Sequence, residues 1–131
     1  MSEEEQQPIE QIDPGKPARD WLYQLEALAR VHNFTEAGKL FHKNCVYFGL
    51  ESDDMLKDWT SVWKGQRNFS VDMAQTRIIV EGNLMLACAP WVAQSLVAGA
   101  PRKAGRFTIG LMQFSNNKLL AVHAHNSYRP E

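Results

Sequence analysis

The sequence is poor in cysteine and has no excess of basic residues. Only two of its 131 residues are cysteines, Cys45 and Cys88, and they stand far apart without the spacing of a metal-binding motif. We expect both to be buried free thiols, because nothing in the sequence indicates an oxidising compartment. The formal net charge is −1, which excludes the strongly basic character typical of nucleic-acid-binding domains.

The sequence also lacks an apolar run of about 18 residues, the length that a membrane-spanning helix needs. Its first residues, MSEEEQQPIEQIDPGKP, are acidic and do not have the basic start and apolar stretch of a secretory signal. We therefore expect a cytoplasmic protein with neither a nucleic-acid nor a membrane partner.

The composition favours one packed domain, since 44% of the residues are apolar and 22% are charged. Residues 1–16 are polar, with Pro8, Pro14, Gly15 and the adjoining Pro17 as breakers of regular structure, so we interpret them as a mobile arm. The domain itself is expected to cover residues 17–131.

Helical patterns come first in this domain. A helix is predicted to start near Pro17–Asp20, with an apolar stripe at helical spacing that includes Trp21 and Leu25. Asn33 or Thr35 is placed to cap a second, short helix. The segment SDDMLKDWTSVWKG predicts another helix, with Ser52 as its N-cap and a glycine at its end.

Strand-like runs fill the rest of the chain. CVYFGL predicts a short strand before the third helix, and four longer β-rich runs begin near Asn68, separated by turn residues such as Gly-Asn and Asn-Asn. Pro90 lies inside one run and indicates an edge, a bulge or a bend. Helices followed by an antiparallel meander are typical of an α+β fold with helices on one face of a curved sheet.

Three segments resemble the nuclear transport factor 2-like superfamily, which includes SnoaL-like and ketosteroid-isomerase-like proteins. They are YFGLESDDMLKDWTSVWKG, the strand GRFTIGLMQF, and the closing run NNKLLAVHAHNSYRP with its His-x-His-x-Ser pattern. The last run is also similar to the end of the association domain of calcium/calmodulin-dependent kinase. It differs from that pattern at Leu119, where Trp is frequent, and at Asn126, where the association domain has a basic residue.

The resemblance implies a cone-shaped roll, in which the N-terminal helices and a curved, mostly antiparallel sheet enclose a pocket. It also implies a homodimer formed through the sheet face. Such pockets are mostly apolar with a few polar groups, and Trp59, Trp63, Trp91 and Tyr47 are candidates to line one here. Taken singly, each of these aromatic side chains is better explained as an ordinary core residue, whereas four tryptophans in one small domain are more than packing usually needs.

His123 and His125 project to the same side of a strand, where they could act as base and acid or as structural histidines. If instead the other face of this strand lines the pocket, Ala124 and Asn126 point inward and both histidines point away. The resemblance to the association domain favours the second arrangement, with Asn126 as a ligand-binding residue.

Arg106 begins a strand on which Thr108 and Gly110 share its face. Inside a cone, Arg106 would bind a carboxylate or another anion with both ends of its guanidinium. Arg77 is expected instead to be a solvated sheet residue, paired with an acid such as Glu81.

Ketosteroid-isomerase-type chemistry needs a carboxylate base and a donor to the oxyanion. Asp72 is the candidate base and Tyr47 the candidate donor. His123 and His125 are alternative candidates for the base and the acid. Asp53 and Asp54 are explained by the N-terminus of a helix. We expect no metal, because the histidine pair has no third ligand at a suitable spacing, and no cofactor.

Three functions remain open from the sequence. The first is a dimeric, SnoaL-like protein that binds a small apolar or anionic molecule without catalysis. The second is an isomerase, dehydratase or cyclase acting on a small apolar carbonyl or carboxylate compound. The third is a non-catalytic oligomerisation module.

Overall fold

The computed structural model describes residues 13–50, 52–99 and 102–128. The expected arm over residues 1–16 therefore lies mostly outside the described residues. The helices are α2 (Lys16–Arg30), α3 (Phe34–Gly38) and α4 (Met55–Val62), with 3₁₀-helices η1 (Trp63–Gly65) and η2 (Met73–Gln75). The strands are β1 (Phe41–Phe48), β2 (Gln66–Val71), β3 (Arg77–Glu81), β4 (Leu84–Ser95), β5 (Lys103–Gln113) and β6 (Leu119–Tyr128).

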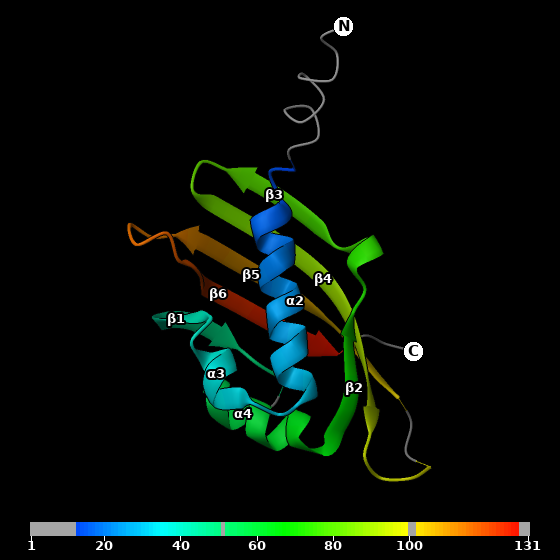
Figure 1. The fold of residues 1–131 in the computed structure, drawn as a ribbon. Helices are drawn as coiled ribbons and strands as arrows, with labels where there is room; N and C mark the ends of the chain where they lie inside the picture. Colours follow the sequence, from blue (N-terminus) through cyan, green and yellow to red (C-terminus); the bar gives the residue numbers. More distant parts are fainter. Residues whose placement is uncertain (1–12, 51, 100–101, 129–131) are drawn as a thin grey trace, which may run out of the picture.

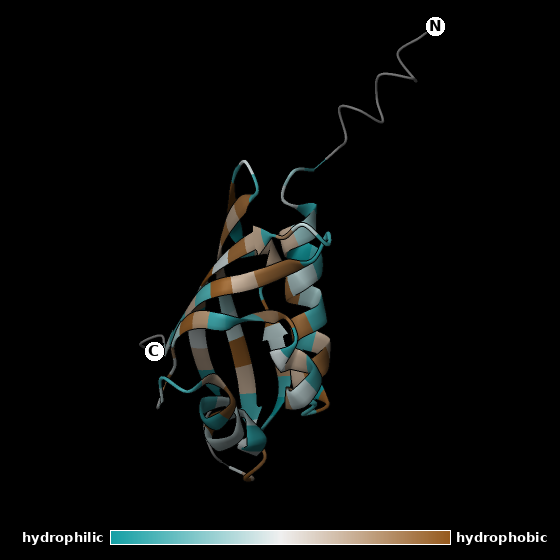
Figure 2. Ribbon diagram, turned by 90° about the vertical axis from the view of Figure 1, so that its left-hand side faces the viewer, coloured by the Kyte–Doolittle hydropathy of each residue, from teal (hydrophilic) through white to brown (hydrophobic). Residues whose placement is uncertain are grey.

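The strands form one six-stranded sheet in the order β1-β6-β5-β4-β2, and β3 pairs with the first part of β4 along the edge that β2 occupies further on (Figure 1). β1 runs parallel to β6, and the other pairs are antiparallel. The sheet is curved, with α2 on one face and no helix of the described residues on the other (Figure 2). The predicted α+β fold with a mostly antiparallel sheet is confirmed.

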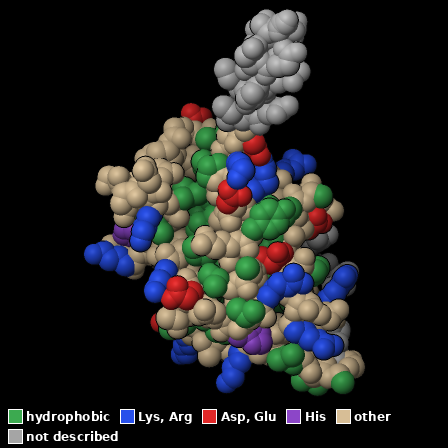
Figure 3. Space-filling model, viewed as in Figure 1, with side chains coloured by type: hydrophobic (Ala, Val, Ile, Leu, Met, Phe, Trp, Pro, Cys, Tyr) green, Lys and Arg blue, Asp and Glu red, His purple; other side chains and the backbone are tan. Residues whose placement is uncertain are grey.

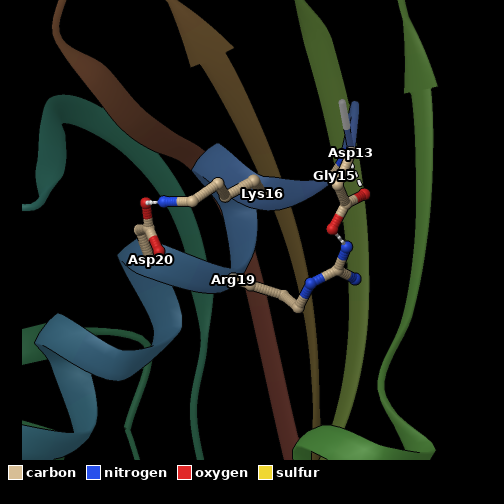
Figure 4. A network of polar contacts seen from close by, with 5 residues as sticks. All are labelled: Asp13, Gly15, Lys16, Arg19 and Asp20. Carbon is tan, nitrogen blue, oxygen red and sulfur yellow. Dashed lines mark hydrogen bonds and ion pairs between the residues drawn. The ribbon is translucent and has the colours of Figure 1, made fainter. Parts of the chain in front are cut away.

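Helix α2 packs on the sheet through the apolar stripe that the sequence predicts. Its buried residues are Ala18, Trp21, Leu22, Leu25 and Ala29. At its start, Asp13 accepts a hydrogen bond from the Gly15 amide at 2.9 Å and pairs with the Arg19 guanidinium (Figure 4). The Glu26 carboxylate accepts a hydrogen bond from the Val71 amide at 2.7 Å, which ties the helix to β2.

The caps of the other helices differ in part from the prediction. Asn33 caps α3 by accepting from the Glu36 amide. The N-cap of α4 is Asp54, not Ser52, because the Asp54 carboxylate accepts from the Lys57 amide at 3.0 Å. Ser52 acts two residues earlier, where its hydroxyl accepts from the Asp54 amide.

Pro90 lies where the strand paired to one edge of β4 changes from β3 to β2. β4 pairs with β3 up to Cys88 and with β2 from Trp91, so the missing N–H of Pro90 falls between the two ladders. The Pro90 carbonyl accepts a hydrogen bond from the Asp72 amide at 2.8 Å. The single run predicted from Asn68 is therefore divided into β2, η2 and β3.

None of the helices in the described part of the chain is both long and apolar enough to span a membrane. On the face that carries α2, basic and acidic side chains are mixed and do not form a basic patch (Figure 3).

Candidate functional site

Aromatic rings occupy the inner side of the sheet. Trp59 stacks on Trp63 at 5.6 Å between ring centroids, and Trp63 lies 5.6 Å from Phe107 and 6.4 Å from Trp91. Phe69 joins the same cluster at 4.8 Å from Trp63. All five rings are at least 97% buried, so the predicted pocket lining is a packed aromatic interior in this structure.

The pairing of β5 and β6 decides which face of the last strand is inward. Ala124 and Asn126 are 2% exposed and face the interior, whereas His125 is exposed on the other side. The Trp91 indole donates a hydrogen bond to the Asn126 side-chain oxygen at 2.8 Å. Among the described residues, nothing accepts a hydrogen bond from the Asn126 side-chain nitrogen.

A buried carboxylate, Asp58, lies beside Tyr47. The Tyr47 hydroxyl donates to Asp58 Oδ2 at 2.6 Å, and the amides of Leu50 and Ser52 donate to the same carboxylate. Burial raises the pKa of Tyr47 well above its usual value, and the hydrogen bond to Asp58 raises it further. Tyr47 therefore keeps its proton and holds the loop after β1 through Asp58.

The face of the sheet opposite α2, called the open face here, carries both histidines and Arg106. Phe48 lies 6.2 Å from each histidine ring, between ring centroids. Arg106 projects outward because its strand neighbours, Gly105 and Phe107, are buried on the inner side. The expectation that Arg106 lies inside the cone is thus corrected by the alternation of β5.

Arg106 lines a hollow of about 440 Å³ on the open face, called the arginine hollow here. Its lining residues are Gln75, Arg77, Cys88, Pro90, Arg106 and Thr108. The ion pairs of the described residues are Lys16–Asp20, Arg19–Asp13 and Lys39–Glu36. Neither arginine of the hollow takes part in one, so both guanidiniums are free to bind an anion.

The expected pair of Arg77 with Glu81 does not form. Both residues are exposed on the same face of β3, but they stand four positions apart, or about 13 Å at the usual rise of a strand. The positive charge of Arg77 is therefore not neutralised by the acid of its own strand, β3.

Of the other acid–base candidates, Asp72 lies apart from both Tyr47 and the histidine pair. Asp72 caps η2, where its carboxylate accepts from the Gln75 amide at 3.3 Å, so it is held at the edge of the sheet and not inside the cone. Among the described residues, no group of three His, Cys, Asp or Glu side chains is arranged to hold a metal.

The two thiols are free, and both are half-buried where full burial was expected. Burial raises the pKa of the Cys45 thiol to about 11. Cys88 lies on the open face, between Arg77 on β3 and Thr108 on β5.

No family model matches the sequence, and no curated protein is significantly similar to it. Several solved structures share the fold. A nuclear transport factor 2-like superfamily protein from Salmonella enterica has a TM-score of 0.71 at 15% identity, over 90% of this chain and 92% of that one.

Two further solved structures with this fold are of the kinds that the sequence resembles. A calcium/calmodulin-dependent kinase II association domain-like protein from Xanthomonas campestris has a TM-score of 0.72 at 10% identity, over 88% of this chain and 87% of that one. A ketosteroid isomerase-like protein from Shewanella frigidimarina has a TM-score of 0.65 at 15% identity, over 82% of this chain and 92% of that one. The chain thus has the nuclear transport factor 2-like fold, which leaves its activity open.

Sequence reasoning missed Asp58 and most of the arginine hollow. A signal for Asp58 was present, since it lies three residues after Met55 and four before Val62, on the buried side of α4. No such signal marks Arg77, because only the pairing of β3 with β4 brings it to Cys88.

Proposed function

We propose that this protein is a non-catalytic, dimeric binding protein for a small anionic molecule, which Arg106 holds in the arginine hollow. The observation that carries the proposal is a hollow in which two unpaired guanidiniums lie with the Thr108 hydroxyl. Guanidiniums bind carboxylates and phosphates through two parallel hydrogen bonds. The Cys88 and Pro90 side chains give the hollow an apolar floor.

The separation of Tyr47 from Asp72, the two groups expected for ketosteroid-isomerase-type chemistry, supports binding without catalysis. Tyr47 is engaged by Asp58 in the interior, Asp72 caps η2, and the histidines contact Phe48 on the open face. A catalytic site needs its acid and base within reach of one substrate.

The open face also supports the proposed homodimer. Five large apolar side chains on the open face are 36–62% exposed: Val46, Phe48, Ile79, Leu84 and Leu86. None of the five lines the arginine hollow, so isologous pairing of this part of the open face with a second copy would remove them from water and leave the hollow open to its ligand. We also propose a cytoplasmic location, since free thiols persist in reducing compartments.

Butyrate, a small carboxylate with an apolar body, is a suitable probe for the hollow. In an NMR titration it should shift the amide signals of Cys88, Arg106 and Thr108, and it should slow alkylation of Cys88 in a Cys45→Ser background. Arg106→Gln should weaken binding by about fivefold to tenfold, because an exposed guanidinium contributes modestly.

The matched control is Arg67→Gln, which removes an exposed arginine of β2 outside the hollow. Binding should be unchanged in this variant. Shifts confined to Trp59 and Asn126 would move the site to the cone interior and overturn the proposal.

The packed aromatic interior favours a second candidate, a non-catalytic oligomerisation module. It predicts assembly through the open face with no ligand in the hollow. An oligomer whose Cys88 alkylation is unaffected by butyrate would favour the module over the binding protein.

A further inference from the structure

The two arginines of the hollow lie on opposite sides of β4. Arg77 on β3 is paired with Cys88, and Arg106 on β5 is paired with Pro90. Cys88 and Pro90 are two residues apart and project to the same face of β4. The guanidiniums therefore reach the hollow from both sides, over backbones about 10 Å apart across the sheet.

The charge of the hollow is not balanced by its own lining. Gln75, Thr108, Cys88 and Pro90 are the other lining residues, and none is a carboxylate. A guanidinium keeps its proton at any pH relevant to proteins, so the two positive charges are permanent. Glu81, the acid on the same face of β3, is about 13 Å from Arg77 along the strand. Asp72 adjoins the hollow but does not line it, and its carboxylate accepts a hydrogen bond from the Gln75 amide.

From this charge balance we propose that the ligand of the arginine hollow is a dianion, which bridges Arg77 and Arg106 across β4. The inference rests on the proposed function, and it adds Arg77 as a second binding residue and a charge class for the ligand. A dicarboxylate with one carboxylate on each guanidinium and a single phosphate group between them share this chemistry. The Thr108 hydroxyl and the Gln75 amide are further donors to the ligand oxygens.

The test compares butyrate, succinate and inorganic phosphate at constant ionic strength, by NMR titration of the hollow amides. Succinate or phosphate should bind the wild-type protein about threefold to tenfold more tightly than butyrate, because the second charge adds one exposed ion pair. Preference for succinate indicates a dicarboxylate, and preference for phosphate indicates a phosphate group.

Single variants then test whether Arg77 binds the second negative charge of the ligand. Arg77→Gln should abolish the preference for the dianion while butyrate still binds, and Arg77→Lys should retain the preference, because the charge remains. Arg67→Gln, as before, should change neither. Thermal unfolding of each variant shows that the fold is retained.

The failures of the two proposals are distinguishable. If succinate, phosphate and butyrate bind the wild type equally, or if Arg77→Gln keeps the preference, the dianion inference is overturned and the anion-binding function stands. If none of the three binds at the hollow, both are overturned.

Discussion

The hydrogen atom at Gly105 leaves room for the indole ring of Trp91. A Cβ atom at this position would collide with that ring and would lie 2.6 Å from the Ser127 carbonyl oxygen. Gly105→Ala should therefore lower the free energy of unfolding by about 2–3 kcal/mol, the usual cost of overpacking a rigid core. Urea denaturation followed by tryptophan fluorescence measures the change.

Gly110 is the matched control on the same strand. A Cβ added there would lie 3.6 Å from the Cβ of His123, an ordinary contact. Gly110→Ala should change the stability by less than about 1 kcal/mol. Equal losses at both glycines would contradict the role assigned to the Trp91 ring.

Tyr47 makes the free energy of unfolding depend on pH in the alkaline range. Its pKa is raised in the folded protein by burial and by its hydrogen bond to Asp58, whereas the unfolded chain has the ordinary value of about 10. The folded state thus holds the proton more tightly. The stabilisation is complete below pH 10 and is lost as pH rises above it, by about 1.4 kcal/mol per pH unit.

Tyr47→Phe isolates this contribution from the titration of lysines. The variant should be less stable than the wild type by about 1–2 kcal/mol at neutral pH, since Asp58 loses a donor. Above pH 10 the difference should shrink, in chemical denaturation series at matched pH. A gap that stays constant up to pH 11 would rule out the raised pKa.

At the scale of the elements, one charged hydrogen bond adds to the apolar packing between α2 and β2. β2 lies at the edge of the sheet, and the Glu26 carboxylate accepts from its Val71 amide. Glu26→Ala should cost about 1–2 kcal/mol and should speed amide hydrogen exchange at Val71, because the N–H loses its acceptor. Gln24→Ala, at an exposed position of the same helix, should do neither.

The element boundaries illustrate what local patterns convey. The stripe of α2 depends only on helical spacing, so it was predictable from residues such as Trp21 and Leu25. The division around Asp72 was not, because it depends on a bond from the Asp72 amide to Pro90, eighteen positions later in the chain.

For the whole molecule, the open face decides the oligomeric state that we propose. Leu86 lies on β4 in one row with Ile79, Gly110, His123 and Val46. Leu86→Glu would place a charge among these side chains and should convert the dimer to a monomer. Size-exclusion chromatography with light scattering at micromolar concentration measures the mass.

Tyr23→Glu is the control, since Tyr23 is 52% exposed on α2, on the other side of the sheet. Its mass should equal that of the wild type. A wild-type protein that is monomeric at micromolar concentration would contradict the proposed dimer.

The sequence determined the class of fold, because hydrophobic periodicity and turn residues act over a few positions. It also indicated Arg106, Trp91 and Asn126 as candidate ligand-binding residues. Only the tertiary structure decided that Asn126 faces the aromatic interior while Arg106 faces outward with Arg77. The reason is physical: a strand exposes alternate residues to opposite faces, and the face that becomes buried depends on pairing with distant strands.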